Sequence, residues 1–269
     1  MRKTTLLATL MLLTALPAAQ AQFDHSHAAF DALLKEYVDK EGLVNYPALR
    51  ANRAKLDSYL ESLGKVTGKE INSWNKDQKI AFWSNAYNAF TLKHIIDHYP
   101  IQRSKSLKAR LYPQNSIRQI DGVWDKLKNI AGGRQITLSD IEHKVLREEL
   151  KDARVHFVIV CASIGCPLLA DHAYSADKLD EQFEEASRLF VQNTDKIKVD
   201  TAKKTIYLSK ILDWFKEDFD SYKGQDKYGK YNGVMSFVAE HLSDSDKAAL
   251  NKAKFKIKWL DYDWSLNEQ

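Results

Sequence analysis

Residues 154–167 have the sequence RVHFVIVCASIGCP, which contains both cysteines of the chain, Cys161 and Cys166. The β-branched residues before Cys161 predict a buried strand over 155–161, and Gly-Cys-Pro at 165–167 predicts the turn that ends this strand. Strand ends and the loops that follow them are common places for reactive side chains. The hypothesis that this protein is an enzyme therefore begins at the cysteine-containing turn.

On both sides of this stretch, apolar periodicity predicts helices and short hairpins. Asn75 is a predicted N-cap for a long helix that ends near residue 98, and a capping box over 139–142 predicts a helix with His143 in its first turns. Further helices are expected at 30–38, 49–63, 179–191, 211–215 and 234–241, hairpins at 128–137 and 197–208, and a strand at 255–260.

This order of elements favours an α+β fold, because helices and strands are interspersed without a regular strand-helix-strand order. We expect a helix-rich single domain over residues 22–269, packed on an antiparallel sheet that contains 155–161 and 255–260. The stretch 101–122 is basic and weakly patterned, so it is expected to be a long surface connection.

The first 21 residues have the pattern of a secretory signal peptide. Arg2 and Lys3 precede an apolar stretch at 6–16, and a small-residue cleavage site follows at 19–21. We therefore expect a periplasmic or secreted protein, and one without a lipid anchor because no cysteine follows the cleavage site. No other stretch is apolar for long enough to cross a membrane. Loss of Arg2 and Lys3 lowers the formal charge from +4 to +2, which argues against a nucleic-acid partner.

Cys166 is the predicted nucleophile. It precedes Pro167, and proline is favoured at the first position of a helix. A helix that began there would present free N–H groups, which stabilise a thiolate and an oxyanion. In the alternative interpretation, Cys161 is a buried core residue and Cys166 a turn residue, either free or joined to Cys161 by a disulfide. We expect a free thiol.

A thiol nucleophile needs a base, and His143 and His156 are the two candidates. On a strand, His156 would lie on the face opposite Cys161, although the turn could bring Cys166 toward it. The charged form of His143 would be disfavoured near a helix N-terminus, as suits a neutral base. The alternative for either residue is a hydrogen-bonded structural histidine.

Two amides, Asn85 and Asn88, lie on the same face of the long predicted helix as small and apolar residues. Buried amides must be hydrogen bonded, so these two would either orient a catalytic histidine or hold the backbone of a neighbouring loop. The second interpretation is slightly favoured.

The sequence gives only weak signals for other kinds of functional site. The chain has no histidine pair with the spacing of zinc ligands, no glycine-rich phosphate loop and no nucleotide-binding fingerprint. His25 and His27 lie in a predicted tail. The sequence therefore predicts neither a cofactor nor a metal.

Several segments together resemble the bacterial, exported branch of the family called domain of unknown function 547. The similarity covers about 46–267, and its one departure is Ser84, where the family more often has isoleucine. It rests on AFWSNAYNA at 81–89, LSDIEH at 138–143, residues 154–167, YLSKI at 207–211 and YDWSLN at 262–267. The family implies a single exported domain and supplies no established reaction.

A looser similarity is to papain-like and transglutaminase-like folds, in which a helix packs on an antiparallel sheet that carries a histidine. Those enzymes keep their cysteine where this chain has Ser84 and Asn85. By this analogy, either the thiol has moved to the 161–166 turn or the fold is used without thiol chemistry.

The leading hypothesis is an exported hydrolase or acyl transferase that acts on amide or thioester bonds of a small peptide-like substrate. Cys166 would attack, His143 or His156 would act as base, and Asn85 or Asn88 would orient it. The rival is a non-catalytic ligand-binding or scaffold domain. A thiol redox protein is the third hypothesis, although four residues separate the cysteines rather than the two of a Cys-x-x-Cys motif. The sequence names no substrate, partner or oligomeric state.

Overall fold

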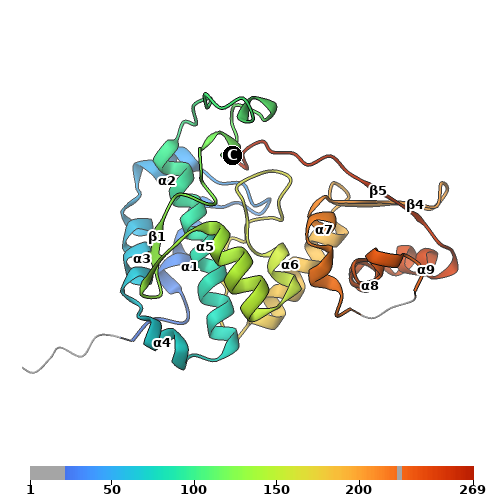
Figure 1. The fold of residues 1–269 in the computed structure, drawn as a ribbon, viewed down its shortest axis with the longest axis horizontal. Coiled ribbons are helices and arrows are strands. Elements are labelled where there is room, and N and C mark those ends of the chain that lie inside the picture. Colours follow the sequence, from blue (N-terminus) through green and yellow to red (C-terminus); the bar gives the residue numbers. More distant parts are fainter. Residues whose placement is uncertain (1–21, 223–225) are drawn as a thin grey trace, which may run out of the picture.

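The computed structural model describes residues 22–222 and 226–269. In the N-terminal half, short helices surround one long buried helix (Figure 1). These helices are α1 (Ala28–Tyr37), α2 (Tyr46–Ala51), α3 (Ala54–Lys65), α4 (Gly68–Ser73) and the long α5 (Lys76–His98). The predicted signal peptide lies outside the described residues. None of the helices in 22–222 and 226–269 combines the length and apolar character that a membrane span requires.

Helix α5 is the centre of this half and begins as the sequence predicts. The Asn75 side chain accepts a hydrogen bond from the Gln78 N–H at 2.8 Å, and the Gln78 side chain accepts one from the Asn75 N–H at 3.0 Å. All side chains from Ile80 to Leu92 are buried, because neighbouring elements cover every face of the helix. The amphipathic pattern is therefore weak here, and the caps are the clearer sequence signal.

The hairpin of β1 (Asn129–Ala131) and β2 (Arg134–Ile136) is confirmed, and it leads into η3 (Asp140–Leu150), a π-helix. The predicted capping box over 139–142 is wrong by two residues. Thr137 and Asp140 form it instead: the Thr137 hydroxyl accepts from the Asp140 N–H at 3.0 Å, and the Asp140 carboxylate accepts from the Thr137 N–H at 3.1 Å. The Glu142 side chain is thereby free to point elsewhere.

The predicted strand over 155–161 is wrong. Residues Ala153–Phe157 form a 3₁₀ helix, η4, and no strand follows it before Cys161. The apolar run is buried as expected, but its backbone groups do not form hydrogen bonds with a neighbouring strand. The side chain of Asn88 donates to the Val158 carbonyl and accepts from the Val160 N–H, both at 2.9 Å. Short apolar runs do not distinguish a strand from other buried segments, and here an amide replaces the neighbouring strand.

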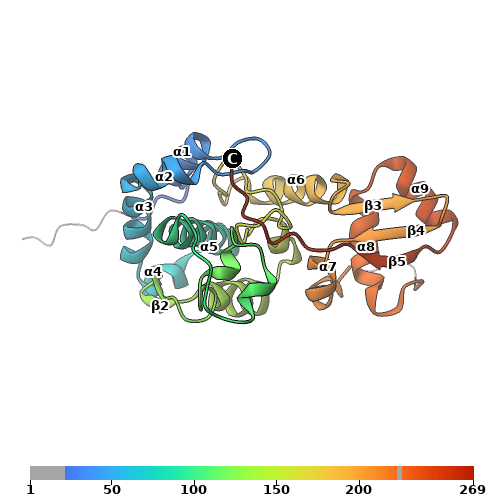
Figure 2. The ribbon, with the colours of Figure 1, turned by 90° about the horizontal axis from the view of Figure 1, so that it is seen from above.

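The C-terminal half contains a three-stranded sheet in the order β3-β4-β5 (Figure 2). β3 and β4 form the predicted antiparallel hairpin, whereas β5 runs parallel to β4, so the sheet is mixed and does not include 155–161. The elements of this half are α6 (Leu179–Gln192), β3 (Ile197–Asp200), β4 (Thr205–Leu208), α7 (Ile211–Trp214), η5 (Lys216–Phe219), η6 (Gly229–Tyr231), α8 (Asn232–His241), α9 (Asp244–Lys252) and β5 (Lys256–Trp259). The α+β fold class is confirmed.

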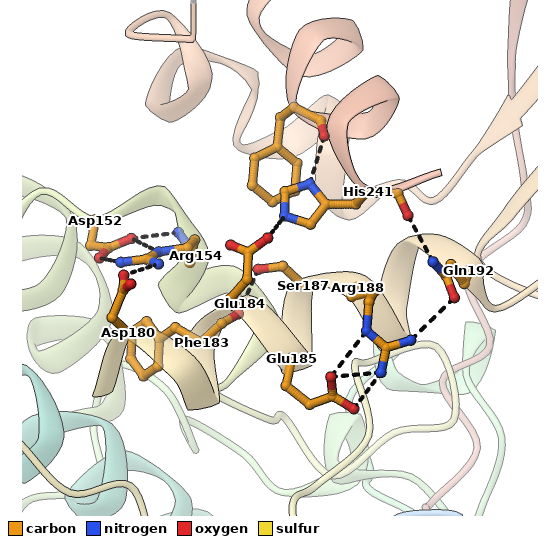
Figure 3. A network of polar contacts seen from close by, with 11 residues as sticks. Asp152, Arg154, Asp180, Phe183, Glu184, Glu185, Ser187, Arg188, Gln192 and His241 are labelled. Atoms are coloured by element: carbon orange, nitrogen blue, oxygen red, sulfur yellow. Dashed lines mark hydrogen bonds and ion pairs between the residues drawn. The ribbon is translucent and has the colours of Figure 1, made fainter. Parts of the chain in front are cut away.

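The connection from α5 to β1 is long and irregular as predicted, with only two short 3₁₀ turns, η1 (Ala109–Leu111) and η2 (Ile117–Gln119), in 101–122. Helix α6 joins the two hydrophobic clusters of the protein: Phe183 belongs to the N-terminal cluster and Phe190 to the C-terminal one. Polar contacts fix this helix at both ends (Figure 3). Arg154 pairs with Asp180 at its start, and Gln192 donates to the His241 carbonyl at its end.

After β5, the chain runs back from the sheet to the N-terminal half, where it ends beside α2 (Figures 1 and 2). This C-terminal segment, residues 260–269, pairs with the cysteine turn at Ser163 and with Val44 near α2. It therefore crosses the molecule over the cysteines, and it contributes a side chain to them.

Candidate active site

The turn that carries the cysteines is held by backbone bonds to the C-terminal segment. The N–H groups of Ile164 and Gly165 donate to the carbonyls of Ser265 and Asp263 at 2.8 and 2.7 Å. Gly165 is required by this close approach, since a Cβ atom there would lie 2.8 Å from the Tyr262 ring and from the Asp263 carbonyl oxygen. The turn thus brings Tyr262 against the two sulfur atoms.

Four side chains form what we call the thiol cluster: Cys161, Ser163, Cys166 and Tyr262. Both cysteines are free, and Cys166 is 4% exposed. The Tyr262 hydroxyl lies 3.0 Å from Cys166 Sγ and 3.2 Å from Cys161 Sγ. The Cys161 N–H also donates to Cys166 Sγ at 3.1 Å, and the Ser163 hydroxyl lies 3.5 Å from the same sulfur.

The expected helix after Cys166 is absent from the described chain, where residues 167–170 are irregular. The donors that surround the sulfur therefore come from side chains and one N–H group rather than from a helix N-terminus. Burial by itself raises the pKa of the Cys166 thiol, but hydrogen bonds from Cys161, Ser163 and Tyr262 favour the thiolate and lower the pKa to about 6. The hydrogen bond with Cys166, and then burial, raise the pKa of Cys161, which stays protonated.

A second group, which we call the charged cluster, contains His143, Arg147, His156 and Asp218. The carboxylate of Asp218 accepts two hydrogen bonds from Arg147, at 2.5 and 3.0 Å, and one from His156 Nε2 at 2.6 Å. Arg147 also donates to His143 Nδ1 at 2.8 Å. These residues come from η3, η4 and η5, so the cluster joins three elements.

Ionisation in the charged cluster follows from these contacts. Burial lowers the pKa of His156 despite the opposing effect of Asp218, so His156 is neutral and its Nε2–H donates to the carboxylate. Burial opposes ionisation of Asp218, but hydrogen bonds from His156 and Arg147 lower its pKa far below the usual range. His156 stacks on Phe215 with the ring centroids 4.0 Å apart, which fixes the ring plane. His156 is therefore an oriented, neutral imidazole.

Five side chains of the two clusters line one pocket with a volume of about 200 Å³: Cys161, Cys166 and Tyr262 of the thiol cluster, and His143 and His156 of the charged cluster. Asp218 and Arg147 contact these histidines but are not lining residues. Aromatic residues make up half of the remaining lining. Glu142 also lies in the wall, where burial raises its pKa and the Tyr87 hydroxyl donates to it at 3.2 Å. The other lining residues include Arg118, Trp124, Trp214, Phe215 and Trp264.

The pocket brings together four of the six predicted site residues: Cys161, Cys166, His143 and His156. In the part of the chain that the structure describes, neither histidine lies within hydrogen-bonding distance of a sulfur atom. Asn85 and Asn88 do not line the pocket. Asn85 bonds the Tyr174 backbone through both its amide atoms, at 2.7 and 3.0 Å, much as Asn88 bonds 158–160. They hold loops, as the slightly favoured interpretation predicts.

Sequence reasoning missed Arg118, Glu142, Arg147, Asp218 and Tyr262. Glu142 and Tyr262 carried a signal, because each lies in one of the segments on which the family resemblance rests, LSDIEH at 138–143 and YDWSLN at 262–267. Asp218 is an unremarkable carboxylate among many until the fold places it 2.6 Å from His156. Within 22–222 and 226–269, no three His, Cys, Asp or Glu side chains are grouped so as to hold a metal ion.

Residues 71–191 match the family model described as "Protein of unknown function, DUF547". The chain therefore resembles this family over α5, η3, η4, both cysteines and both candidate histidines. The matched range is narrower than 46–267 and leaves out Asp218 and Tyr262. No curated protein and no solved structure matches the chain.

Proposed function

We propose that this protein is a thiol-dependent hydrolase or acyl transferase that acts on a small peptide-like amide or thioester. The single observation that supports this function best is the environment of Cys166. Donors from three residues stabilise its thiolate, and the pocket that it lines also contains a histidine oriented by a carboxylate. Nucleophile, base and orienting acid are the groups that acyl transfer through a thiol requires.

In the first step, the Cys166 thiolate attacks the substrate carbonyl carbon and the carbonyl electron pair moves to oxygen. The Tyr262 hydroxyl and the Cys161 N–H are the donors beside this sulfur. When the carbon–oxygen double bond re-forms, the leaving group departs and a thioester to Cys166 remains. A thiolate leaving group needs no proton, whereas an amine takes one, for which the protonated Cys161 thiol is an acid beside the nucleophile.

In the second step, water or an acceptor amine attacks the thioester and Cys166 leaves as the thiolate. His156 receives the proton of the attacking group at Nδ1, because its Nε2–H is held by Asp218. The resulting imidazolium is stabilised by the Asp218 carboxylate. Water as the attacking group gives a hydrolase, and an amine gives a transferase.

The proposed site of action is outside the cytoplasm, in the periplasm or the medium. The sequence pattern of residues 1–21 supports this location, with two basic residues, an apolar stretch and a small-residue cleavage site. Two cysteines that work as free thiols in an oxidising compartment must resist disulfide formation.

A thiol redox protein is the second candidate, and one observation favours it. Both sulfur atoms contact the same Tyr262 hydroxyl, and they differ in ionisation as the attacking and resolving thiols of a redox pair do. The non-catalytic alternative is a binding domain that uses the aromatic pocket without the thiols.

The rate at which iodoacetamide alkylates Cys166, followed across pH by peptide mass mapping, tests the thiolate. We expect the rate to reach half its maximum near pH 6. At pH 5 it should exceed that of an ordinary thiol about tenfold, after allowing for the lower nucleophilicity of an acidic thiolate. Tyr262→Phe should move the midpoint upward, and Tyr207→Phe, in the distant sheet, should leave it in place. A midpoint near that of free cysteine would contradict the proposal and favour the binding domain.

Intact mass after incubation with a small acyl thioester separates the two thiol chemistries. A hydrolase or transferase gains the mass of the acyl group, and Cys166→Ser does not. A redox protein instead loses two hydrogens on mild oxidation and recovers them with dithiothreitol, without acyl transfer. Formation of the disulfide without any acyl adduct would favour the redox function over the proposed one.

A further inference from the structure

Arg118 occupies an unusual position in the pocket wall. Its guanidinium carbon lies over three aromatic rings, 4.3 Å from the centroid of Tyr112, 4.7 Å from Trp264 and 5.3 Å from Trp124. Such contacts hold a guanidinium by its faces, through cation–π attraction. The edge of the group, where its N–H donors lie, stays available.

The donors of Arg118 are largely unused. Its side chain donates to the Tyr112 hydroxyl at 2.5 Å, and among the described residues no carboxylate lies within ion-pair distance of it. Glu142, the one carboxylate among the lining residues, is bonded to Tyr87, and Asp218, which contacts the lining residue His156, is bonded to His156 and Arg147. The pocket wall therefore contains a positive charge that has no ion-pair partner among the residues that the structure describes.

Arg118 is connected to the nucleophile through two rings. Its guanidinium lies over Trp264, the Trp264 and Tyr262 centroids are 4.5 Å apart, and the Tyr262 hydroxyl is 3.0 Å from Cys166 Sγ. The same rings thus orient the arginine and the thiol. In a pocket of about 200 Å³, a group that reaches the sulfur also lies near the guanidinium.

We propose that Arg118 binds a carboxylate of the substrate, so that the pocket selects small acyl groups that carry a negative charge. A guanidinium edge matches the two oxygens of a carboxylate. The aromatic wall strengthens this contact, because it excludes water from around the pair. This inference rests on the proposed function and specifies its substrate class.

Two alkylating agents of nearly equal size provide the test: neutral iodoacetamide and anionic iodoacetate. The measured quantity is the ratio of the iodoacetate rate to the iodoacetamide rate at Cys166, compared with the same ratio for glutathione. We expect the protein to raise this ratio about tenfold, the factor that one charge-assisted hydrogen bond contributes. High salt should reduce the excess.

Arg118→Gln should return the ratio to the glutathione value, because the iodoacetate rate should fall more than the iodoacetamide rate. Arg118→Lys should give an intermediate ratio, because it keeps the charge and loses the planar edge. Arg110→Gln is the matched control: it removes the same charge from the exposed turn η1 and should preserve the ratio.

Two results would overturn the inference. The first is a wild-type ratio equal to that of glutathione. The second is an equal fall of both rates in Arg118→Gln, which would mean that Arg118 shapes the pocket without recognising charge. Either result leaves the thiol proposal intact, since that proposal is tested separately, by the alkylation midpoint of Cys166 with iodoacetamide and by the acyl adduct.

Discussion

The thiol cluster and the charged cluster both contribute side chains to one pocket and are built in opposite ways. In the charged cluster, each ionised group has an opposite charge as partner: Asp218 accepts three hydrogen bonds from two residues. In the thiol cluster, the Cys166 thiolate is stabilised by neutral hydroxyl, thiol and N–H donors. The paired charges hold three elements together, whereas the thiolate remains available for attack. The first cluster therefore contributes mainly to stability and the second mainly to reactivity.

Removal of the central carboxylate tests the first half of this contrast. Asp218→Asn leaves Arg147 without its ion partner and weakens the hydrogen bond to His156. The free energy of unfolding should therefore fall by about 3 kcal/mol. This value is the lower end of the range for a broken buried ion pair, and it applies because the Asp218 side chain is 21% exposed. Denaturant unfolding measures this change. Asp220→Asn, two residues away and exposed, is the control and should change stability by less than about 0.5 kcal/mol.

The thiol cluster should not respond to this substitution. The midpoint of Cys166 alkylation depends on donors at 161, 163 and 262, so it should stay near pH 6 in Asp218→Asn. A shift of that midpoint to the value of free cysteine would show that the two clusters are coupled, and the contrast between them would fail.

The two buried amides of α5 sharpen the comparison, because both hold a loop but only one loop carries a thiol. Asn88→Ala leaves the Val158 carbonyl and the Val160 N–H unpaired, and Asn85→Ala does the same at Tyr174. Each variant should lose about 2 kcal/mol of unfolding free energy, the usual cost of buried polar groups left without partners.

Reactivity should separate these two variants. Residues 158–160 lead directly to Cys161, whose N–H donates to Cys166 Sγ, so Asn88→Ala should raise the alkylation midpoint. Asn85→Ala should leave it unchanged. Equal midpoints in both variants would mean that the C-terminal segment alone positions the thiol cluster.

Local signals predicted much of this fold. The cap at Asn75, the two hairpins and the helix at 179–191 depend on residues close together in the chain, and all are confirmed. The strand predicted over 155–161 failed because its partner is the amide of Asn88, some seventy residues earlier in the chain. The same limit applies to the site: the cysteines share one turn and were found, whereas Asp218 and Tyr262 approach only through the tertiary fold.

The smallest expected effect concerns the start of η3, which supplies His143 and Arg147 to the charged cluster. Thr137→Ala removes the hydroxyl that accepts from the Asp140 N–H and should lower stability by about 1 kcal/mol, the usual value of an N-cap. Thr137→Ser keeps the hydroxyl and loses only the methyl group, so it measures how much of the stability lost in Thr137→Ala comes from the methyl group. Ser139→Ala should cost less than about 0.5 kcal/mol, since its side chain makes no capping bond. Thermal unfolding of the three variants measures their order of stability. A larger loss of stability in Ser139→Ala than in Thr137→Ala would support the capping box predicted from sequence over the observed one. Since η3 supplies none of the donors to Cys166, each variant should keep its alkylation midpoint near pH 6.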